Sequence, residues 1–267
     1  MDKMFCFQCQ QTAHNTGCEG NAGVCGKKCG TANAQDALTN ALIGLARAVN
    51  KKTPSEQSDR LVLKGLFTTI TNVNFHEDNV RKLTQEIQME RTAIDVSAEE
   101  YDIRNIWEDH EDIRSLKSLI LFGLRGMAAY AYHALALGYT DRSVLDYFYE
   151  ALAVLGESSD TSKENSERLL SYVLKTGEVN YRCMELLDKA HTESYGTPVP
   201  TEVPLTIEKG PFIVVSGHDL HDLKLLLEQT EGKGINIYTH SEMLPAHGYP
   251  ELKKYPHLKG NFGTAWQ

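Results

Sequence analysis

Five of the six cysteines lie within the first 29 residues: Cys6, Cys9, Cys18, Cys25 and Cys29. The first four follow the pattern Cys-x2-Cys-x8-Cys-x6-Cys in a stretch rich in glycine. Glycine lets such a loop fold tightly, so its thiolates can converge and backbone N–H groups can approach the sulfurs. Iron–sulfur clusters need four soft thiolate ligands, and such hydrogen bonds tune their potential. The spacing therefore predicts an iron–sulfur cluster on these four cysteines and a protein that carries electrons.

Other roles for these cysteines stay open. A zinc site also uses four cysteines, but usually as two closely spaced pairs, and only Cys6 and Cys9 form such a pair here. A disulfide framework needs an oxidising compartment, whereas the N-terminus lacks the apolar stretch of a signal peptide. Cys29 is a fifth candidate ligand, and at most one of Cys25 and Cys29 is needed. Cys183 stands alone in a helical pattern and is expected to be a buried apolar residue.

Five of the ten histidines lie in the last 50 residues: His218, His221, His240, His247 and His257. His240 comes just past a predicted strand, at the carboxyl edge where open α/β sheets bind ligands. His240, Glu242 and His247 place two imidazoles and a carboxylate within eight residues, a set suited to iron. The alternative for each histidine is a structural hydrogen bond, and we expect that role for His257.

The region that must position the cysteine loop is almost wholly helical. Apolar residues recur at three- and four-residue spacing, which is typical of amphipathic helices. Gly65 and Gly123 follow apolar runs of similar sequence, and we expect them to permit close helix approach. The predicted helices are Ala37–Val49, Leu61–Val73, Val80–Arg91, Leu116–Leu135, Ser143–Leu155, Glu164–Lys175 and Glu178–Ala190.

The pattern changes after the Pro/Gly-bearing linker Tyr195–Pro200. Phe212–Ser216 is a β-branched run of the kind buried in a parallel sheet. An amphipathic helix, Leu220–Gln229, and a second strand beginning at Ile235–Tyr238 follow it, which predicts a βαβ unit. The expected organisation is a cysteine-rich loop (1–32), a helical bundle domain (33–200) and the beginning of an α/β domain (201–267). The apolar residues Phe262–Gln267 lead us to expect that the chain stops partway through this domain.

Composition narrows the range of partners. The net charge of −9 argues against nucleic acid and anionic membranes. The most apolar run, Leu119–Gly138, is interrupted by Arg125 and His133, and therefore reads as a buried core helix rather than a membrane span. We expect a soluble protein of the cytoplasm.

Five segments together resemble the hybrid cluster proteins, also called prismane proteins or hydroxylamine reductases. These segments are Met4–Ala13, Gly17–Cys18, Gly23–Lys27, Ser216–Leu220 and Tyr238–Pro250. The resemblance implies a helical domain followed by two α/β domains, and a conventional cluster on the four cysteines. It also implies that His240 is a ligand of a hybrid iron–sulfur–oxygen cluster at the domain interface. The family reduces hydroxylamine to ammonia and is implicated in nitric oxide reduction and nitrosative stress.

Two departures from the family pattern bear on cofactor and activity. The eight-residue cysteine gap matches the family's four-iron type and the six-residue gap its two-iron type, and we favour [4Fe–4S] over [2Fe–2S]. The chain resembles only the first half of the family, so we expect two glutamate and several cysteine ligands of the hybrid cluster beyond Gln267.

Three functions therefore stay open. In the first, the chain is the half of a hydroxylamine reductase through which electrons enter from a redox donor protein. This half alone is expected to be inactive. Glu242 and His247 would assist His240 in catalysis. The second is a stand-alone electron-transfer or binding module. The third, a nickel-dependent carbon monoxide dehydrogenase, would need a different cysteine spacing.

Overall fold

The computed structural model describes residues 3–9, 14, 16–49, 52–70, 74–158 and 160–264. The chain forms two compact units. The helical unit comprises residues 1–132 and 140–184, and the sheet unit comprises residues 133–139 and 185–267. The two units divide between residues 184 and 185, within the long helix Lys163–Tyr195. The domain boundary expected near residue 200 stays a prediction.

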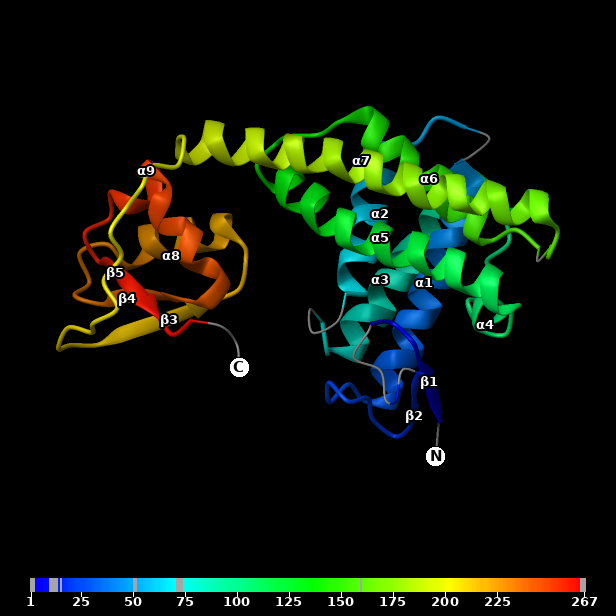
Figure 1. Cartoon of the computed structure of the whole chain (residues 1–267), viewed down its shortest axis with the longest axis horizontal. Helices are drawn as coiled ribbons and strands as arrows, with labels where there is room; N and C mark the ends of the chain where they lie inside the picture. The colour runs from blue at the N-terminus through cyan, green and yellow to red at the C-terminus, as the bar shows by residue number, and fades with distance from the viewer. Residues whose placement is uncertain are drawn as a thin grey trace. The chain divides into compact units, whose positions relative to one another are not determined.

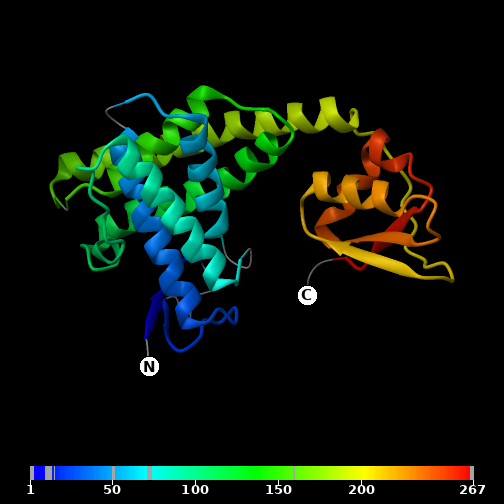
Figure 2. The ribbon, with the colours of Figure 1, turned by 180° about the vertical axis from the view of Figure 1, so that it is seen from behind.

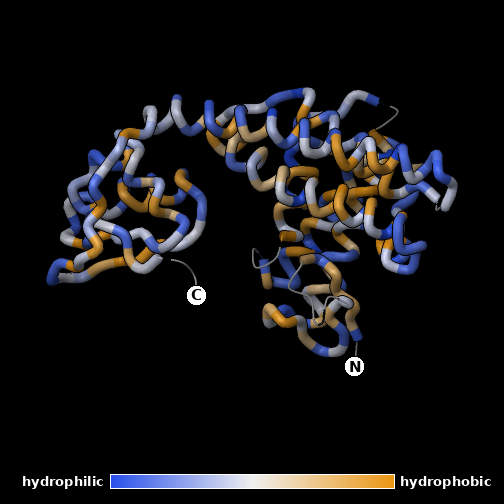
Figure 3. Tube along the Cα trace, in the orientation of Figure 1, coloured by the Kyte–Doolittle hydropathy of each residue, from blue (hydrophilic) through white to orange (hydrophobic). Residues whose placement is uncertain are grey.

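The helical unit consists of a small hairpin and a set of packed helices (Figure 1). Helix α1 packs against α2, α3 and α6, and strand β1 lies beside α1 (Figure 2). Hydrophilic and hydrophobic residues alternate along these helices (Figure 3), which lets each bury one side. The elements are β1 (Met4–Cys6), β2 (Cys18–Gly20), α1 (Cys29–Val49), α2 (Glu56–Thr68), α3 (Glu77–Ile94), α4 (Arg104–Trp107), α5 (Glu111–Ala136), α6 (Arg142–Leu155) and α7 (Lys163–Tyr195).

The helical pattern is confirmed, with two corrections. Helix α1 begins at Cys29, inside the stretch predicted to be a loop. The two helices predicted on either side of Gly177 are one helix, α7, because a single glycine costs only about 1 kcal/mol in a helix and packing can outweigh it. The predicted end of the second helix, Val73, lies outside the described residues, and α2 itself ends at Thr68.

Two glycines allow helices to approach closely, as expected. A Cβ atom at Gly65 would lie 2.8 Å from Leu42 Cδ2, and one at Gly123 would lie 2.7 Å from Thr176 Cγ2. Both distances are shorter than carbon–carbon contact allows, so a larger residue would force the facing side chain or its helix to shift.

Helix α5 is the one described helix whose length and hydropathy would suit a membrane span. Several of its apolar residues are fully buried in the helical unit, among them Ile120, Leu121 and Leu124. These contacts fit the predicted core helix.

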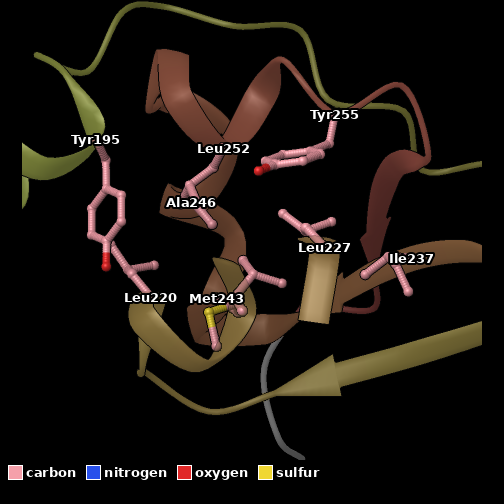
Figure 4. Packing of buried hydrophobic residues seen from close by; sticks show 9 residues of the cluster. Tyr195, Leu220, Leu227, Ile237, Met243, Ala246, Leu252 and Tyr255 are labelled. Atoms are coloured by element: carbon pink, nitrogen blue, oxygen red, sulfur yellow. The ribbon is translucent and has the colours of Figure 1, made fainter. Parts of the chain in front are cut away.

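The sheet unit is built on three parallel strands in the order β3-β4-β5. Ser216 pairs with His240, and His240 pairs with Phe262, so the three carboxyl ends meet at one edge. Buried side chains from α8, the 3-10 helix η2 and α9 form the core of the unit together with Ile237 and Tyr195 (Figure 4). The predicted βαβ unit is confirmed. The elements are β3 (Phe212–Ser216), α8 (Leu220–Thr230), β4 (Asn236–His240), η2 (Ser241–Gly248), α9 (Pro250–Lys253) and β5 (Leu258–Phe262).

Strand β3 differs from its prediction in burial. Its side chains are largely exposed, with Phe212 at 49% and Val214 at 40%. In the described part of the chain β3 pairs only with β4, so an edge strand, not a buried central one, carries this β-branched run. The end of the apolar segment Phe262–Gln267 lies outside the described residues from 265 onward.

Candidate functional site

The cysteine loop is organised by the β1–β2 hairpin and a tight turn after it. Cys6 lies opposite Cys18 in the antiparallel pair. The Gly23 N–H donates to the Lys27 carbonyl at 2.8 Å, which holds Cys25 inside the turn. A Cβ atom on Gly23 would lie 3.6 Å from Cys25 Sγ and 3.8 Å from Cys18 Sγ. Two predicted ligands therefore face the same bare glycine, where the missing side chain leaves room beside both sulfurs.

The other two cysteines of the loop differ in their surroundings. Cys29, the first residue of α1, packs with Met4 and Cys18 in a small buried cluster that Cys6 also contacts. Cys9 is half-buried and follows Gln8. The structure thus brings Cys18 together with Cys6, Cys25 and Cys29, but it does not place Cys9 with them.

The donor set fits an iron–sulfur cluster by its chemistry. None of the six cysteines, all of which are described, is in a disulfide. Within the described residues, no three His, Cys, Asp or Glu side chains are arranged to hold one metal ion. The assignment of four cysteine ligands therefore stays a prediction, carried by thiol chemistry and by the space at Gly23.

Buried charged groups lie beneath the loop, and the sequence reasoning missed their role. Lys27 is 2% exposed, and its Nζ donates to Gln35 Oε1. Asp36 on α1 accepts a hydrogen bond from Gln8 Nε2 at 2.9 Å. Burial raises the pKa of Asp36 to about 6, and the same cause raises the pKa of the Cys6 thiol. Arg125, which the sequence marked only as an interruption of an apolar run, is 3% exposed.

His240 is the last residue of β4, at the carboxyl edge of the sheet. Its Nδ1 lies 3.0 Å from the hydroxyl of Ser216, the paired residue on β3. A Cβ atom at Gly263 would lie 3.2 Å from His240 Nε2, so the backbone after β5 closely approaches the ring. Gly263 has a φ of +75°, a conformation that favours glycine. The imidazole is thus held between β3 and the segment after β5.

Glu242 and His247 do not flank His240 as a single group of ligands. Oε2 of Glu242 lies 2.5 Å from Nε2 of His218, and both side chains are exposed. His247 is buried, with its Nε2 2.9 Å from the Thr239 hydroxyl. Thr239 and His240 are neighbours on one strand and therefore point to opposite faces of the sheet. His247 lies on the face away from His240.

His247 contacts the His240 region indirectly. The Thr239 hydroxyl donates to Asn261 Oδ1 at 2.9 Å, and Asn261 Nδ2 donates to the carbonyl of Gly263 at 3.0 Å. Burial lowers the pKa of His247, and a hydrogen bond to the backbone of Gly260 opposes this shift. The arrangement fits a group that fixes the segment supporting His240.

Of the two other histidines singled out in the sequence, His257 makes side-chain hydrogen bonds and His221 makes a backbone hydrogen bond. The Nε2 of His257 lies 3.0 Å from the Thr230 hydroxyl and 3.1 Å from the Leu227 carbonyl. The backbone N–H of His221 donates to Asp219, the N-cap of α8.

The Prismane/CO dehydrogenase family model matches residues 4–267. The chain belongs to this family. A hydroxylamine reductase of Solidesulfovibrio magneticus is 46% identical, over 99% of this chain and 54% of the relative. One from Methanocella arvoryzae is 45% identical, over the same shares. The chain spans about half the length of these curated relatives.

A carbon monoxide dehydrogenase from Carboxydothermus hydrogenoformans is a more distant structural match. It covers 98% of this chain and 42% of that chain, at 17% identity and a TM-score of 0.34.

Proposed function

We propose that Cys6, Cys9, Cys18 and Cys25 hold an iron–sulfur cluster, of [4Fe–4S] type in preference to [2Fe–2S]. When bound, this group takes up and releases electrons one at a time. The convergence of Cys18 and Cys25 on the bare Gly23 carries the proposal. Family membership supports it, because it favours iron over zinc for a loop of this composition.

We further propose that the chain is the electron-receiving half of a hydroxylamine reductase. The curated relatives bear that name. The reaction consumes two electrons and two protons and yields ammonia and water, so the protein needs a redox donor and proton-conducting groups. We extend the substrate range to nitric oxide on the resemblance alone, and place the protein in the cytoplasm.

The residues at the carboxyl edge of the sheet have separable tasks under this proposal. His240 is the ligand offered to a hybrid cluster, and the Ser216 hydroxyl orients its ring. Glu242 and His218 are exposed and bonded to each other, which suits them to pass protons. His247 acts as a positioning residue through Thr239.

The cluster assignment is tested by serine substitution and metal analysis. Anaerobically purified protein is expected to hold about four irons and four sulfides per chain. Cys9→Ser should lose most of that iron, because serine oxygen is a poor substitute for thiolate. Comparing Cys25→Ser with Cys29→Ser identifies which of the two is the ligand.

The matched control is Cys183→Ala. Cys183 is buried in the helical unit and its thiol contacts the Met127 carbonyl, away from the loop. Its replacement should leave the iron content unchanged. Stoichiometric zinc in place of iron in the wild-type protein would refute the assignment.

A further inference from the structure

Arg125 of α5 is a cation in the core of the helical unit with unused hydrogen-bond donors. Its side chain is 3% exposed, and Nη2 donates to the Thr39 hydroxyl at 3.3 Å. Nε and Nη1 have no hydrogen-bond partner among the described residues. A buried guanidinium with idle N–H groups is strongly unfavourable unless another interaction compensates for it.

The groups around Arg125 show where that compensation lies. Asp36 and the thiolate forms of Cys6 and Cys9 all favour its charged form electrostatically, and Asp36 acts most strongly of the three. Burial lowers the pKa of Arg125 to about 10, so the guanidinium stays charged at neutral pH. The geometry ties Arg125 to the cysteine loop: its guanidinium carbon lies 5.9 Å from the centre of the Phe122 ring. That ring stacks with Phe7, which lies between Cys6 and Cys9 in the sequence, at 6.3 Å between ring centroids.

The other charged groups near the cysteines leave a positive balance. Lys27 favours the ionised forms of both Asp36 and Cys6, as expected of a nearby cation. Lys27 already donates to Gln35, whereas Arg125 keeps two N–H-bearing nitrogens in reserve. Among the described residues near the cysteines, the buried cations Lys27 and Arg125 thus face the buried carboxyl group of Asp36, whereas Asp102, which also acts on Asp36, is partly exposed.

We infer that Arg125 is held in the core to stabilise the negative charge of the cluster, and that it thereby raises the cluster's reduction potential. This inference rests on the proposed cluster. A centre with four thiolate ligands becomes more negative when it accepts an electron. A fixed cation in a medium of low dielectric constant therefore stabilises the reduced form more than the oxidised form. Arg125 is a positioning and tuning residue here, not a ligand.

The test is a redox titration of the anaerobically purified 267-residue chain, followed by electron paramagnetic resonance. Arg125→Met should move the midpoint potential to a more negative value, and Arg125→Lys, which keeps the charge, should restore most of the shift. Asp36→Asn should move the potential in the opposite direction, because it removes a negative charge from the same site. Arg114→Met is the matched control, since Arg114 lies exposed on the same helix, and it should leave the potential unchanged.

The possible outcomes separate this inference from the proposed function. A wild-type chain that assembles no iron–sulfur cluster overturns both. A cluster that forms in full in Arg125→Met and titrates at the wild-type potential overturns only the role of Arg125. If Arg125→Met fails to fold, the double variant Arg125→Met/Asp36→Asn removes the buried cation together with the buried carboxylate that faces it. Its potential should then lie below that of Asp36→Asn alone, and equal potentials would refute the inference.

Discussion

His240 and His247 illustrate how neighbouring residues in sequence take separate tasks. Their spacing suggested a common centre, but the strand ends at His240 and the chain then turns through Ser241, which has a φ of +51°. The turn carries His247 to the face of the sheet where Thr239 points. His240, the candidate ligand, and Thr239, which contacts the buried His247, are therefore one strand position apart and point to opposite faces of the sheet.

The Asp219 carboxylate gives a pH-dependent contribution to stability. Burial raises its pKa, but hydrogen bonds from His133 and from the backbone N–H groups of Asp222 and His221 outweigh this and lower it to about 2. An unfolded aspartate titrates near pKa ~3.9. The stabilisation is therefore fully present above about pH 4 and is lost as the pH falls through the folded value.

We predict that Asp219→Asn flattens this acid dependence. Asparagine can still cap α8, but it cannot carry the charge that faces His133. Urea unfolding between pH 5 and pH 2 measures the difference between variant and wild type. An identical loss of stability in both proteins over that range would contradict the role of Asp219.

The sequence predicts metal ligands more readily than it predicts the buried charged side chains near those ligands. The cysteines stand out because four soft donors recur within one short loop. Nothing in the sequence marks Lys27 and Asp36 as buried, and Arg125 stands out only as a charge within an apolar run, since tertiary packing decides which charges are buried and what they contact. The ion pair of Glu242 with His218 also depends on the fold, because the pairing of β3 with β4 brings together the segments that follow these two strands, 24 residues apart in sequence.

At the scale of elements, two glycines of α5 should respond oppositely to the same change. Gly126 has open space around it, so Gly126→Ala should stabilise the protein by about 0.5–1 kcal/mol through helix propensity. Gly123→Ala should destabilise it by about 1–3 kcal/mol through overpacking. Its Cβ would meet Thr176, a buried residue whose hydroxyl bonds Tyr147 and which cannot move aside freely.

Chemical denaturation of the two alanine variants measures both effects. Both variants replace glycine by alanine in α5, so the contribution of helix propensity to the free energy of unfolding is the same in both. The difference between their free energies of unfolding therefore reports the contact of residue 123 with α7. Equal stabilisation by both variants would show that α5 and α7 do not pack closely at Gly123.

Helix periodicity predicted the positions of most helices, but not the residues at which they begin and end. Sequence composition likewise did not predict which strand is exposed to solvent. Capping explains part of the error in helix ends: Ser55 caps α2 and shares a reciprocal hydrogen bond with Ser58, so the helix begins five residues before the predicted start at Leu61. Gly177 predicted a break that the packing of α7 overrides. Strand β3 has a core-like composition and yet is exposed, because composition does not report a strand's neighbours.

At the scale of the whole molecule, the chain carries two candidate sites, one in each of its two compact units. The cysteine loop belongs to the helical unit and His240 to the sheet unit. Relatives about twice as long have the further length in which additional ligands for a larger centre can reside. Under the proposed function, the first unit receives electrons and the second offers one ligand to the place where they are used.

We therefore predict that the purified 267-residue chain binds its cluster but shows negligible hydroxylamine reduction with a chemical electron donor. A protein of the relatives' length containing this chain should be active. The physical reason is that reduction of an N–O bond needs several metal ligands around the substrate. Among the described residues, no three His, Cys, Asp or Glu side chains are arranged to hold one metal ion.

In the longer protein, His240→Ala should reduce turnover severely, because it removes the proposed metal ligand. His247→Ala should reduce it less, since His247 reaches that region only through Thr239 and Asn261. His257→Ala is the control, because its contacts are to α8. The rate of ammonia formation, measured anaerobically, distinguishes a ligand role of His240 from a structural one. Robust turnover by the 267-residue chain would refute the division of the active site, and wild-type rates in His240→Ala would make His240 a structural residue.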